Sequence, residues 1–177
     1  MAKLKFDVLD IENDTNEINS WCHTLYNHEN YKSIKQFALH GSYFDLAHLL
    51  SSTYEPTSKD PSKQQVQMAV RENNEIVAFV VFKMHDLNAE PYTYLHYIVV
   101  KPDKQGQKIG EKIVKALPDE IKKLFGKKPT EIYGYIEKEN SASQALFTKL
   151  GAELEETYDD NFFKVVIDVA SKQKSYE

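Results

Sequence analysis

The chain has 177 residues, of which 41% are hydrophobic and 28% are charged, and its formal net charge is −5. This composition excludes a fibrous or disordered chain, and the scattered lysines argue against nucleic acid as a partner. The longest apolar runs are too short to cross a bilayer, the first residues lack the apolar core of a signal peptide, and Cys22 is the single cysteine. We therefore expect a cytoplasmic protein without a membrane partner. We also expect one domain over residues 1–177, with a core from 65 to 168 and a polar tail from about 170 to 177.

The first third of the chain predicts one strand followed by helices and a loop. Residues from Lys5 to Leu9 largely alternate between apolar and polar types, which indicates a strand. The spacing from Asp14 to Glu17 is that of a capping box, so an amphipathic helix is predicted to begin with Asp14 as its N-cap. Apolar residues at helical spacing between 34 and 50 predict one or two further helical pieces, and residues 51–63 are predicted to form a loop.

The middle third predicts a hairpin, a strand and a helix. Gln65–Arg71 and Ile76–Lys83 alternate as strands around a polar turn, which is the pattern of a β-hairpin. Tyr92–Val100 is rich in β-branched and aromatic residues and predicts a third strand. A helix is predicted from about Gln107, and Pro118 is expected to end or kink it, or else to open a second short helix.

The last third predicts a strand, a helix and a closing hairpin. Glu131–Ile136 is a strand by composition, and Ser141–Gln144 has the form of a second capping box. The helix that follows is expected to run to Leu150 and to end with Gly151 as a left-handed cap, before two strands in 153–158 and 162–168. The complete order is β-α-α-β-β-β-α-β-α-β-β, which predicts a mixed α/β (α+β) fold with a central mixed sheet and helices on both faces.

The stretch from Tyr92 to Gly110 organises the chain, because it joins a strand to a helix through a polar loop that holds Gly106 and Gly110. Backbone N–H groups of a first helical turn have no intrahelical partner, and the positive end of the helix dipole lies with them. The sequence therefore indicates a site for a phosphate group. The alternative is an ordinary turn between a strand and a helix.

These residues resemble the GNAT superfamily of acyl-CoA-dependent N-acyltransferases. The family has Gln/Arg-x-x-Gly-x-Gly/Ala between a strand and a helix, and Gln105–Gly110 lies in that frame. A second family signature begins with Asn, continues with a small residue and an aromatic residue on a helix, and ends with Gly; here it is similar to Asn140, Ser143, Phe147 and Gly151. The order of the predicted elements matches as well.

The resemblance implies acetyl-CoA as co-substrate, with its pyrophosphate on the glycine loop and its pantetheine arm paired with a strand that splays from its neighbour. No metal is expected, because the six histidines lack a ligand spacing and one cysteine cannot form a thiolate cluster. The residues that the resemblance assigns to the cofactor are Val99, Val100, Gln105, Gly106, Gln107, Lys108, Ile109, Gly110, Asn140, Ser143 and Phe147.

Two residues depart from the family pattern. Lys108 stands where the family usually has glycine, and its side chain either crowds the pyrophosphate or attracts it. Phe147 stands where many members have a tyrosine that protonates the departing thiolate, and a phenyl ring cannot donate a proton. Loss of a general acid costs about 10² to 10⁴ in rate, so another donor or a water molecule is needed.

Two side chains are the candidates for proton transfer. His96 is expected to lie with Tyr94 and Ile98 on one face of the predicted strand, and it resembles the strand histidine that some family members use to take a proton from the amine. Tyr135, or Tyr133 two residues before it, is the candidate donor in place of the missing tyrosine. The alternative is that these residues only fill the sheet.

Together these features predict an enzyme that transfers an acetyl group from acetyl-CoA to a primary amine, by direct attack in a ternary complex. His96 or a chain of water molecules serves as the base, and a backbone N–H near Val99 meets the oxyanion. The amine is a small molecule or a peptide, and the protein is a monomer or a homodimer. One alternative is a non-catalytic acyl-CoA-binding or regulatory module on the same fold. Another is an interaction domain with no affinity for coenzyme A.

Overall fold

The computed structural model describes residues 3–10, 13, 14, 16–18, 20, 65–85 and 90–170. The helices predicted between 34 and 50, the loop predicted over 51–63 and the tail from 171 lie outside the described residues. The strands are β1 (Lys5–Val8), β2 (Gln65–Glu72), β3 (Glu75–His85), β4 (Tyr92–Val100), β5 (Glu131–Glu137), β6 (Glu153–Glu156) and β7 (Phe162–Asp168). The helices are the 3-10 helix η3 (Pro102–Lys104), α4 (Ile109–Phe125) and α5 (Ser141–Lys149), and the described residues from 13 to 20 are helical too.

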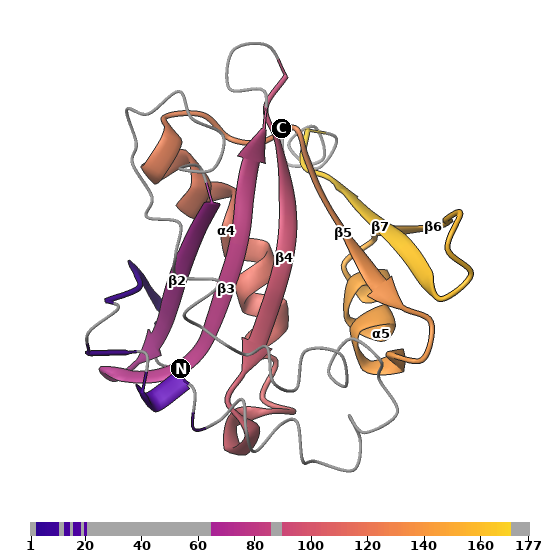
Figure 1. The fold of residues 1–177 in the computed structure, drawn as a ribbon. Coiled ribbons are helices and arrows are strands. Elements are labelled where there is room, and N and C mark those ends of the chain that lie inside the picture. The colour runs from indigo at the N-terminus through magenta and orange to yellow at the C-terminus, as the bar shows by residue number, and fades with distance from the viewer. Residues whose placement is uncertain are drawn as a thin grey trace.

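The described strands form one seven-stranded sheet in the order β1-β2-β3-β4-β5-β7-β6 (Figure 1). Neighbouring strands are antiparallel except for β4 and β5, which are parallel. The mixed sheet that the sequence predicts is therefore confirmed. Among the described residues, none of the helices is long and apolar enough to cross a membrane.

The β2–β3 hairpin follows from its turn residues. Asn73 and Asn74 have φ angles of 52° and 67°, the left-handed conformation that a two-residue type I′ turn needs at both central positions. Asparagine tolerates this region better than most residues other than glycine, so the Asn-Asn pair fixes the turn and the register of the strands. The hairpin predicted from the sequence is confirmed.

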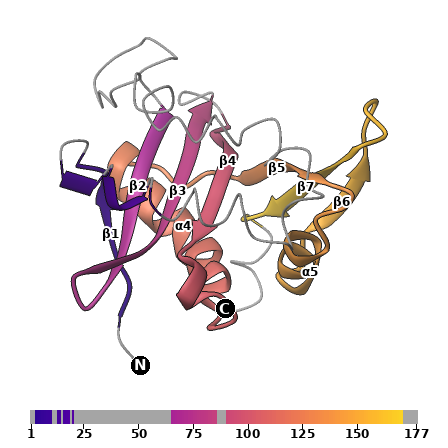
Figure 2. The same cartoon turned by 60° about the horizontal axis from the view of Figure 1, so that its bottom comes forward.

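Helices cover both faces of the sheet. α4 and α5 lie on one face, α4 across β2–β4 and α5 beside β5 (Figure 1 and Figure 2). One hydrophobic core lies under them and includes Ile113 and Leu117 of α4 and Phe147 of α5. A second, smaller core on the opposite face includes Ile18 of the N-terminal helical residues and Val99 of β4. The strand β4 thus contributes to both cores.

Strands β4 and β5 separate partway along their length. Their parallel register joins Tyr92–Tyr94 to 131–133 and ends there, and the two strands then diverge (Figure 1). Gly134 lies at the point of separation, where a Cβ atom would be 2.9 Å from the carbonyl oxygen of Leu95. Only glycine permits this approach of the two backbones without a shift. Beyond it, the edge of β4 that faces β5 is open.

The helix boundaries correct three predictions. Pro118 neither ends α4 nor opens a second helix, because α4 continues through it from Ile109 to Phe125, and the kink expected as the other outcome stays a prediction. An interior proline costs about 3 kcal/mol, but Leu117 and Ile121 beside it are fully buried, and that packing holds the helix together.

Both N-caps lie before the predicted residues. Asp10 rather than Asp14 caps the first helix, since its carboxylate accepts the N–H of Asn13 at 3.2 Å. The carboxylate of Asp14 instead accepts the N–H of Asp10 at 3.1 Å and pairs with Arg71 of β2 at 2.6 Å. In α5 the cap is Asn140, not Ser141.

The predicted C-terminal cap of α5 is confirmed. Gly151 has a φ of 75°, its N–H donates to the carbonyl of Thr148, and the N–H of Ala152 donates to the carbonyl of Phe147. This pair of bonds is a Schellman motif. It turns the chain sharply from α5 into β6.

Candidate functional site

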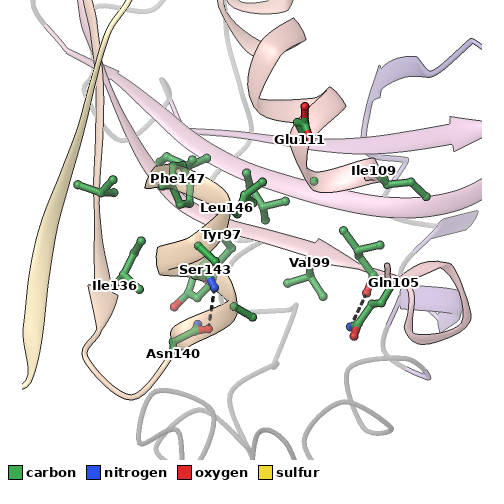
Figure 3. Close-up of a pocket in the computed structure, with 18 of the residues that line it drawn as sticks. Tyr97, Val99, Gln105, Ile109, Glu111, Ile136, Asn140, Ser143, Leu146 and Phe147 are labelled. Carbon is green, nitrogen blue, oxygen red and sulfur yellow. Dashed lines mark hydrogen bonds between the residues drawn. The ribbon is translucent and has the colours of Figure 1, made fainter. Parts of the chain in front are cut away.

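A cleft of about 510 Å³ opens where β4 and β5 diverge (Figure 3). Its walls are β4, the loop and first turn that lead into α4, β5 and the helix α5. The cleft brings together residues that lie far apart in the sequence. Those of the predicted cofactor and catalytic residues that line it are His96, Val99, Val100, Gln105, Gly106, Lys108, Ile109, Gly110, Tyr135, Asn140, Ser143 and Phe147.

Gln107 is the predicted site residue that does not line the cleft. Its side-chain amide donates to the carbonyl of Asp103 at 3.3 Å, within the loop itself. The neighbouring Gln105 does line the cleft, and its amide donates to the carbonyl of Val100 at 3.3 Å (Figure 3). These two bonds fold the loop back on itself and onto the end of β4.

The N-terminus of α4 presents backbone donors beside the cleft. Its first intrahelical bond runs from the N–H of Lys112 to the carbonyl of Lys108, so the N–H groups of Ile109, Gly110 and Glu111 have no partner within the helix. The N-cap residue, Lys108, provides no side-chain cap. Three backbone donors at the positive end of a helix dipole therefore stand beside the cleft.

Lys108 has a strained backbone. Its φ and ψ are 62° and 20°, in the left-handed region that glycine occupies readily and lysine does not. Such a conformation costs a residue with a side chain about 1–2 kcal/mol. The position is the one where the resemblance implied glycine, so the loop keeps the glycine geometry with a lysine in it.

Three lysines line this end of the cleft: Lys104, Lys108 and Lys149. Lys104 pairs with Glu75, the first residue of β3, at 3.4 Å, and Lys149 of α5 pairs with Glu111 of α4 at 2.7 Å. The three cations lie around the end of the cleft that the positive end of the α4 helix dipole also faces.

Glu111 lies in the first turn of α4 beside the cleft (Figure 3), and an ion pair with Lys149 ties α4 to α5. Its carboxylate binds Lys115 one turn along α4 at 2.8 Å as well as Lys149 of α5. Hydrogen bonds from these two lysines lower the pKa of Glu111 to about 2, so the carboxylate is ionised at neutral pH. The pattern from 111 to 115 is visible in the sequence as an i, i+4 pair, but the partner 38 residues away is not.

The residues of the second signature have roles in α5 itself. The side-chain oxygen of Asn140 accepts the N–H of Ser143 at 3.1 Å and so caps the helix (Figure 3). Phe147 is 7% exposed and packs in the core below α4 and α5, with part of its surface on the cleft. It has no polar atom to offer there.

A β-bulge in β4 places His96. Val81 of β3 lies opposite Tyr97, and the next residue, Phe82, lies opposite Leu95, so His96 is the extra residue. The expectation that His96 and Ile98 lie on one face of the strand is wrong for this reason. Ile98 packs against the core under α4, whereas the His96 ring lies 4.1 Å from the ring of Tyr94 on the opposite face.

The backbone of β4 alternates beyond the bulge. The N–H of Lys101 donates to Val77 of β3, so by the two-residue period of a strand the polar groups of Val99 also point toward β3. The groups of Ile98 and Val100 then point to the open edge. Ile98 lines the cleft and was missed from the sequence, because a bulge leaves no mark in the pattern of residue types.

His96 is neutral at physiological pH. Burial, followed by the positive charge of Lys83 and the nearby His85, lowers the pKa of His96 to about 4. Its Nε2 atom is buried and has no hydrogen-bond partner in the described part of the chain. A buried nitrogen without a partner is costly, so an acceptor or donor from a bound molecule would be favourable here.

Tyr135 lies on the opposite wall of the cleft from His96. It is 45% exposed, and its ring meets that of Tyr94 edge-on at 6.0 Å. Its hydroxyl can therefore exchange protons with a molecule in the cleft or with solvent. Among the described residues, no group of three His, Cys, Asp or Glu side chains is close enough to hold a metal ion.

Comparison with known protein families gives one match. A model described as the acetyltransferase (GNAT) family matches residues 16–152. A comparison with curated proteins finds no match.

Several solved structures share the fold. The PaiA N-acetyltransferase of Thermoplasma acidophilum, solved with coenzyme A, has a TM-score of 0.70 and 17% identity over 94% of this chain and 99% of that one. An acetyltransferase of Thermus thermophilus has a TM-score of 0.65 and 15% identity over 96% and 100%. The N-acetyltransferase PseH of Campylobacter jejuni, solved with acetyl coenzyme A, has a TM-score of 0.57 and 15% identity over 95% and 100%. At these identities the likeness shows the fold alone.

Proposed function

Because the chain belongs to the acetyltransferase (GNAT) family, we propose that it transfers an acetyl group from acetyl-CoA to a primary amine by direct attack in a ternary complex. The observation that carries this proposal is the cleft between β4 and β5, which has an uncapped helix N-terminus at one end and a neutral histidine at the other. The helix N-terminus suits the phosphates of a nucleotide cofactor. The neutral histidine suits an amine that must lose a proton.

The residues present fit coenzyme A. The free N–H groups of 109–111 would bind the pyrophosphate, and Lys104, Lys108 and Lys149 would add positive charge around it. The open edge of β4 offers the N–H and carbonyl of Ile98 and the N–H of Val100 to the amides of the pantetheine arm, whereas the carbonyl of Val100 already accepts the amide of Gln105. Asn140 and Ser143 line the same wall, with Asn140 already engaged as the cap of α5.

The thioester supplies an activated acetyl group. When the amine attacks its carbonyl carbon, a C–N bond forms, the C–S bond breaks, the amine gives up one proton and the thiolate takes one up. His96 or a chain of water molecules would take up the proton of the amine, and because Nε2 of His96 is buried, its neighbours would have to shift before the amine or water could reach it. With a pKa near 4, His96 is a weak base, so its contribution lies at the low end of the range for such groups.

Two further groups complete the reaction. The N–H of Ile98 on the open edge of β4 would stabilise the negative charge on the carbonyl oxygen, which specifies the backbone N–H near Val99 that the sequence analysis expects. Tyr135 would protonate the thiolate, since Phe147 cannot. The exposure of Tyr135 supports this role, because a buried phenol would not regain its proton from solvent.

Phe147 also favours a second candidate, a non-catalytic acyl-CoA-binding or regulatory module. Thiol release from acetyl-CoA with a panel of primary amines, together with calorimetric titration of coenzyme A, separates the two. The proposal expects saturable binding and amine-dependent release. Binding without release from any amine would favour the module, and a lack of binding would refute both.

A further inference from the structure

One carboxylate holds two lysines of the loop that leads into α4. Glu75, the first residue of β3, binds Nζ of Lys101 through Oε1 at 2.6 Å and Nζ of Lys104 through Oε2 at 3.4 Å. Hydrogen bonds from Lys101 and then Lys104 lower the pKa of Glu75, so the carboxylate is ionised at neutral pH. The three charged groups therefore join the start of β3 to the loop beside the cleft.

The local backbone brings these three side chains together. Lys101 follows the end of β4, and its N–H donates to the carbonyl of Val77 in β3 at 2.8 Å. The N–H of Lys104 donates to the carbonyl of Lys101 at 2.9 Å, within the 3-10 turn of η3. Residues three apart lie on the same side of such a turn, so both lysines can reach one carboxylate. Glu75 itself follows the left-handed turn of the β2–β3 hairpin, which fixes where β3 begins.

Lys104 is the partner of Glu75 that lies at the cleft. It lines the cleft together with Gln105 and Lys108, and it ends η3 immediately before the glycine loop. Its side chain is 24% exposed, so it lies along the protein surface instead of extending into solvent. An ammonium group has three N–H donors, and a contact with one oxygen of Glu75 leaves donors for an anion in the cleft.

The ion pair with Glu75 restricts Lys104 before an anion arrives. A lysine side chain has many rotamers, and part of the free energy of any contact is lost in fixing one of them. A lysine that is already restricted loses less on binding. The carboxylate of Glu75 itself repels phosphates little, because Lys101 lies 2.6 Å from it and the two ammonium groups leave one net positive charge.

We propose that Glu75 is a positioning residue: it holds the ammonium group of Lys104 where the phosphates of coenzyme A enter the cleft. Glu75 acts through Lys104 and does not touch the cofactor. This inference rests on the acetyl transfer proposed above, because it needs coenzyme A in the cleft between β4 and β5. It adds to that site a residue from the β2–β3 hairpin, far from the glycine loop in the sequence.

The test is a double-mutant cycle on the affinity for coenzyme A. Isothermal titration calorimetry of the full chain measures the Kd of the wild type, Glu75→Ala, Lys104→Met and the double variant. We expect Glu75→Ala to bind coenzyme A about twofold to fivefold more weakly, the effect of an exposed ion pair. In the Lys104→Met background the same substitution should leave the Kd almost unchanged, because the side chain that Glu75 positions is gone.

Glu120→Ala is the matched control. Glu120 of α4 is not among the residues that line the cleft, and it pairs with Lys123 at 2.6 Å. Its replacement therefore removes the same charge and one ion pair at another place on the protein, and we expect no change in the Kd for coenzyme A. Glu75 is 43% exposed, so the Glu75→Ala variant should fold, and thermal unfolding checks this for every variant.

Unchanged or tighter binding by Glu75→Ala would overturn the inference, and tighter binding would show that the carboxylate only repels the phosphates. A comparable weakening in the Lys104→Met background would overturn it too, since Glu75 would then act through Lys101 or the loop as a whole. In each of these results the wild type still binds coenzyme A, so the proposed function stands. If the wild type does not bind coenzyme A, the proposed function and this inference fail together.

Discussion

Replacing Lys108 with glycine is expected to make the protein more stable and its hold on acetyl-CoA weaker. Lys108 has a φ of 62° at the N-cap of α4, a conformation that costs a residue with a side chain about 1–2 kcal/mol. Glycine removes this cost but adds freedom to the unfolded chain, worth about 0.4–1 kcal/mol in the opposite direction. At the middle of these two ranges the net gain in the free energy of unfolding is about 0.8 kcal/mol, or a rise of about 2–3 °C in Tm.

The same substitution removes a positive charge from the mouth of the cleft. Lys108 is exposed, so an ion pair between its ammonium and a phosphate is worth about 0.2–1 kcal/mol. We therefore expect acetyl-CoA to bind about 1.5-fold to fivefold more weakly, with most of the difference lost at high salt. Thermal unfolding and calorimetric titration at two salt concentrations measure the two effects.

Lys108→Gln is the matched control. It keeps a long side chain in the left-handed conformation and removes only the charge, so it should lose affinity without gaining stability. Equal stabilities of the Gly and Gln variants would refute the strain at this position. Tighter binding by the Gly variant would show that the lysine side chain crowds the phosphates instead of attracting them.

Three further outcomes are expected. The folded-state pKa of His96 is lowered to about 4, so below pH 6.5 the unfolded chain binds more protons than the folded protein. As pH falls to 4, the free energy of unfolding measured in urea should therefore decrease by up to about 3 kcal/mol more for the wild type than for His96→Gln. Equal decreases for the two proteins would contradict this. Gly134→Ala places a Cβ atom 2.9 Å from the Leu95 carbonyl oxygen and should lower the free energy of unfolding by about 1–3 kcal/mol in the same assay, whereas an unchanged value would show that the strands can move apart. Tyr135→Phe should lower kcat for thiol release by about 10²-fold with little change in KM for acetyl-CoA, and an unchanged kcat would exclude it as the proton donor.

Local chemistry made much of the fold predictable. Asn73 and Asn74 accept the left-handed conformation that a type I′ turn requires, so the β2–β3 hairpin could be predicted from the residues of its turn. Gly151 ends α5 for a similar reason. The glycine loop and the start of α4 could be predicted from neighbouring residues too, because the strand, the glycines and the start of the helix lie together in the sequence.

Features set by distant parts of the chain were not predictable. The bulge at His96 depends on how β4 pairs with β3, and no feature of the residue types from 92 to 100 marks its position. Pro118 continues α4 because the residues beside it are buried against the sheet, which a local rule about proline does not include. The bond from Glu111 to Lys149 joins two helices whose neighbourhood exists only in the fold.

Hydrogen–deuterium exchange with and without acetyl-CoA tests the central claim most directly, because it reports where on the chain the ligand binds. If the cleft between β4 and β5 holds acetyl-CoA, protection should appear in peptides that cover 98–111 and 140–147, while the β2–β3 hairpin at 65–83 stays unchanged. Protection confined to other segments, or no protection at saturating acetyl-CoA, would contradict the assignment of the cleft as the acetyl-CoA site.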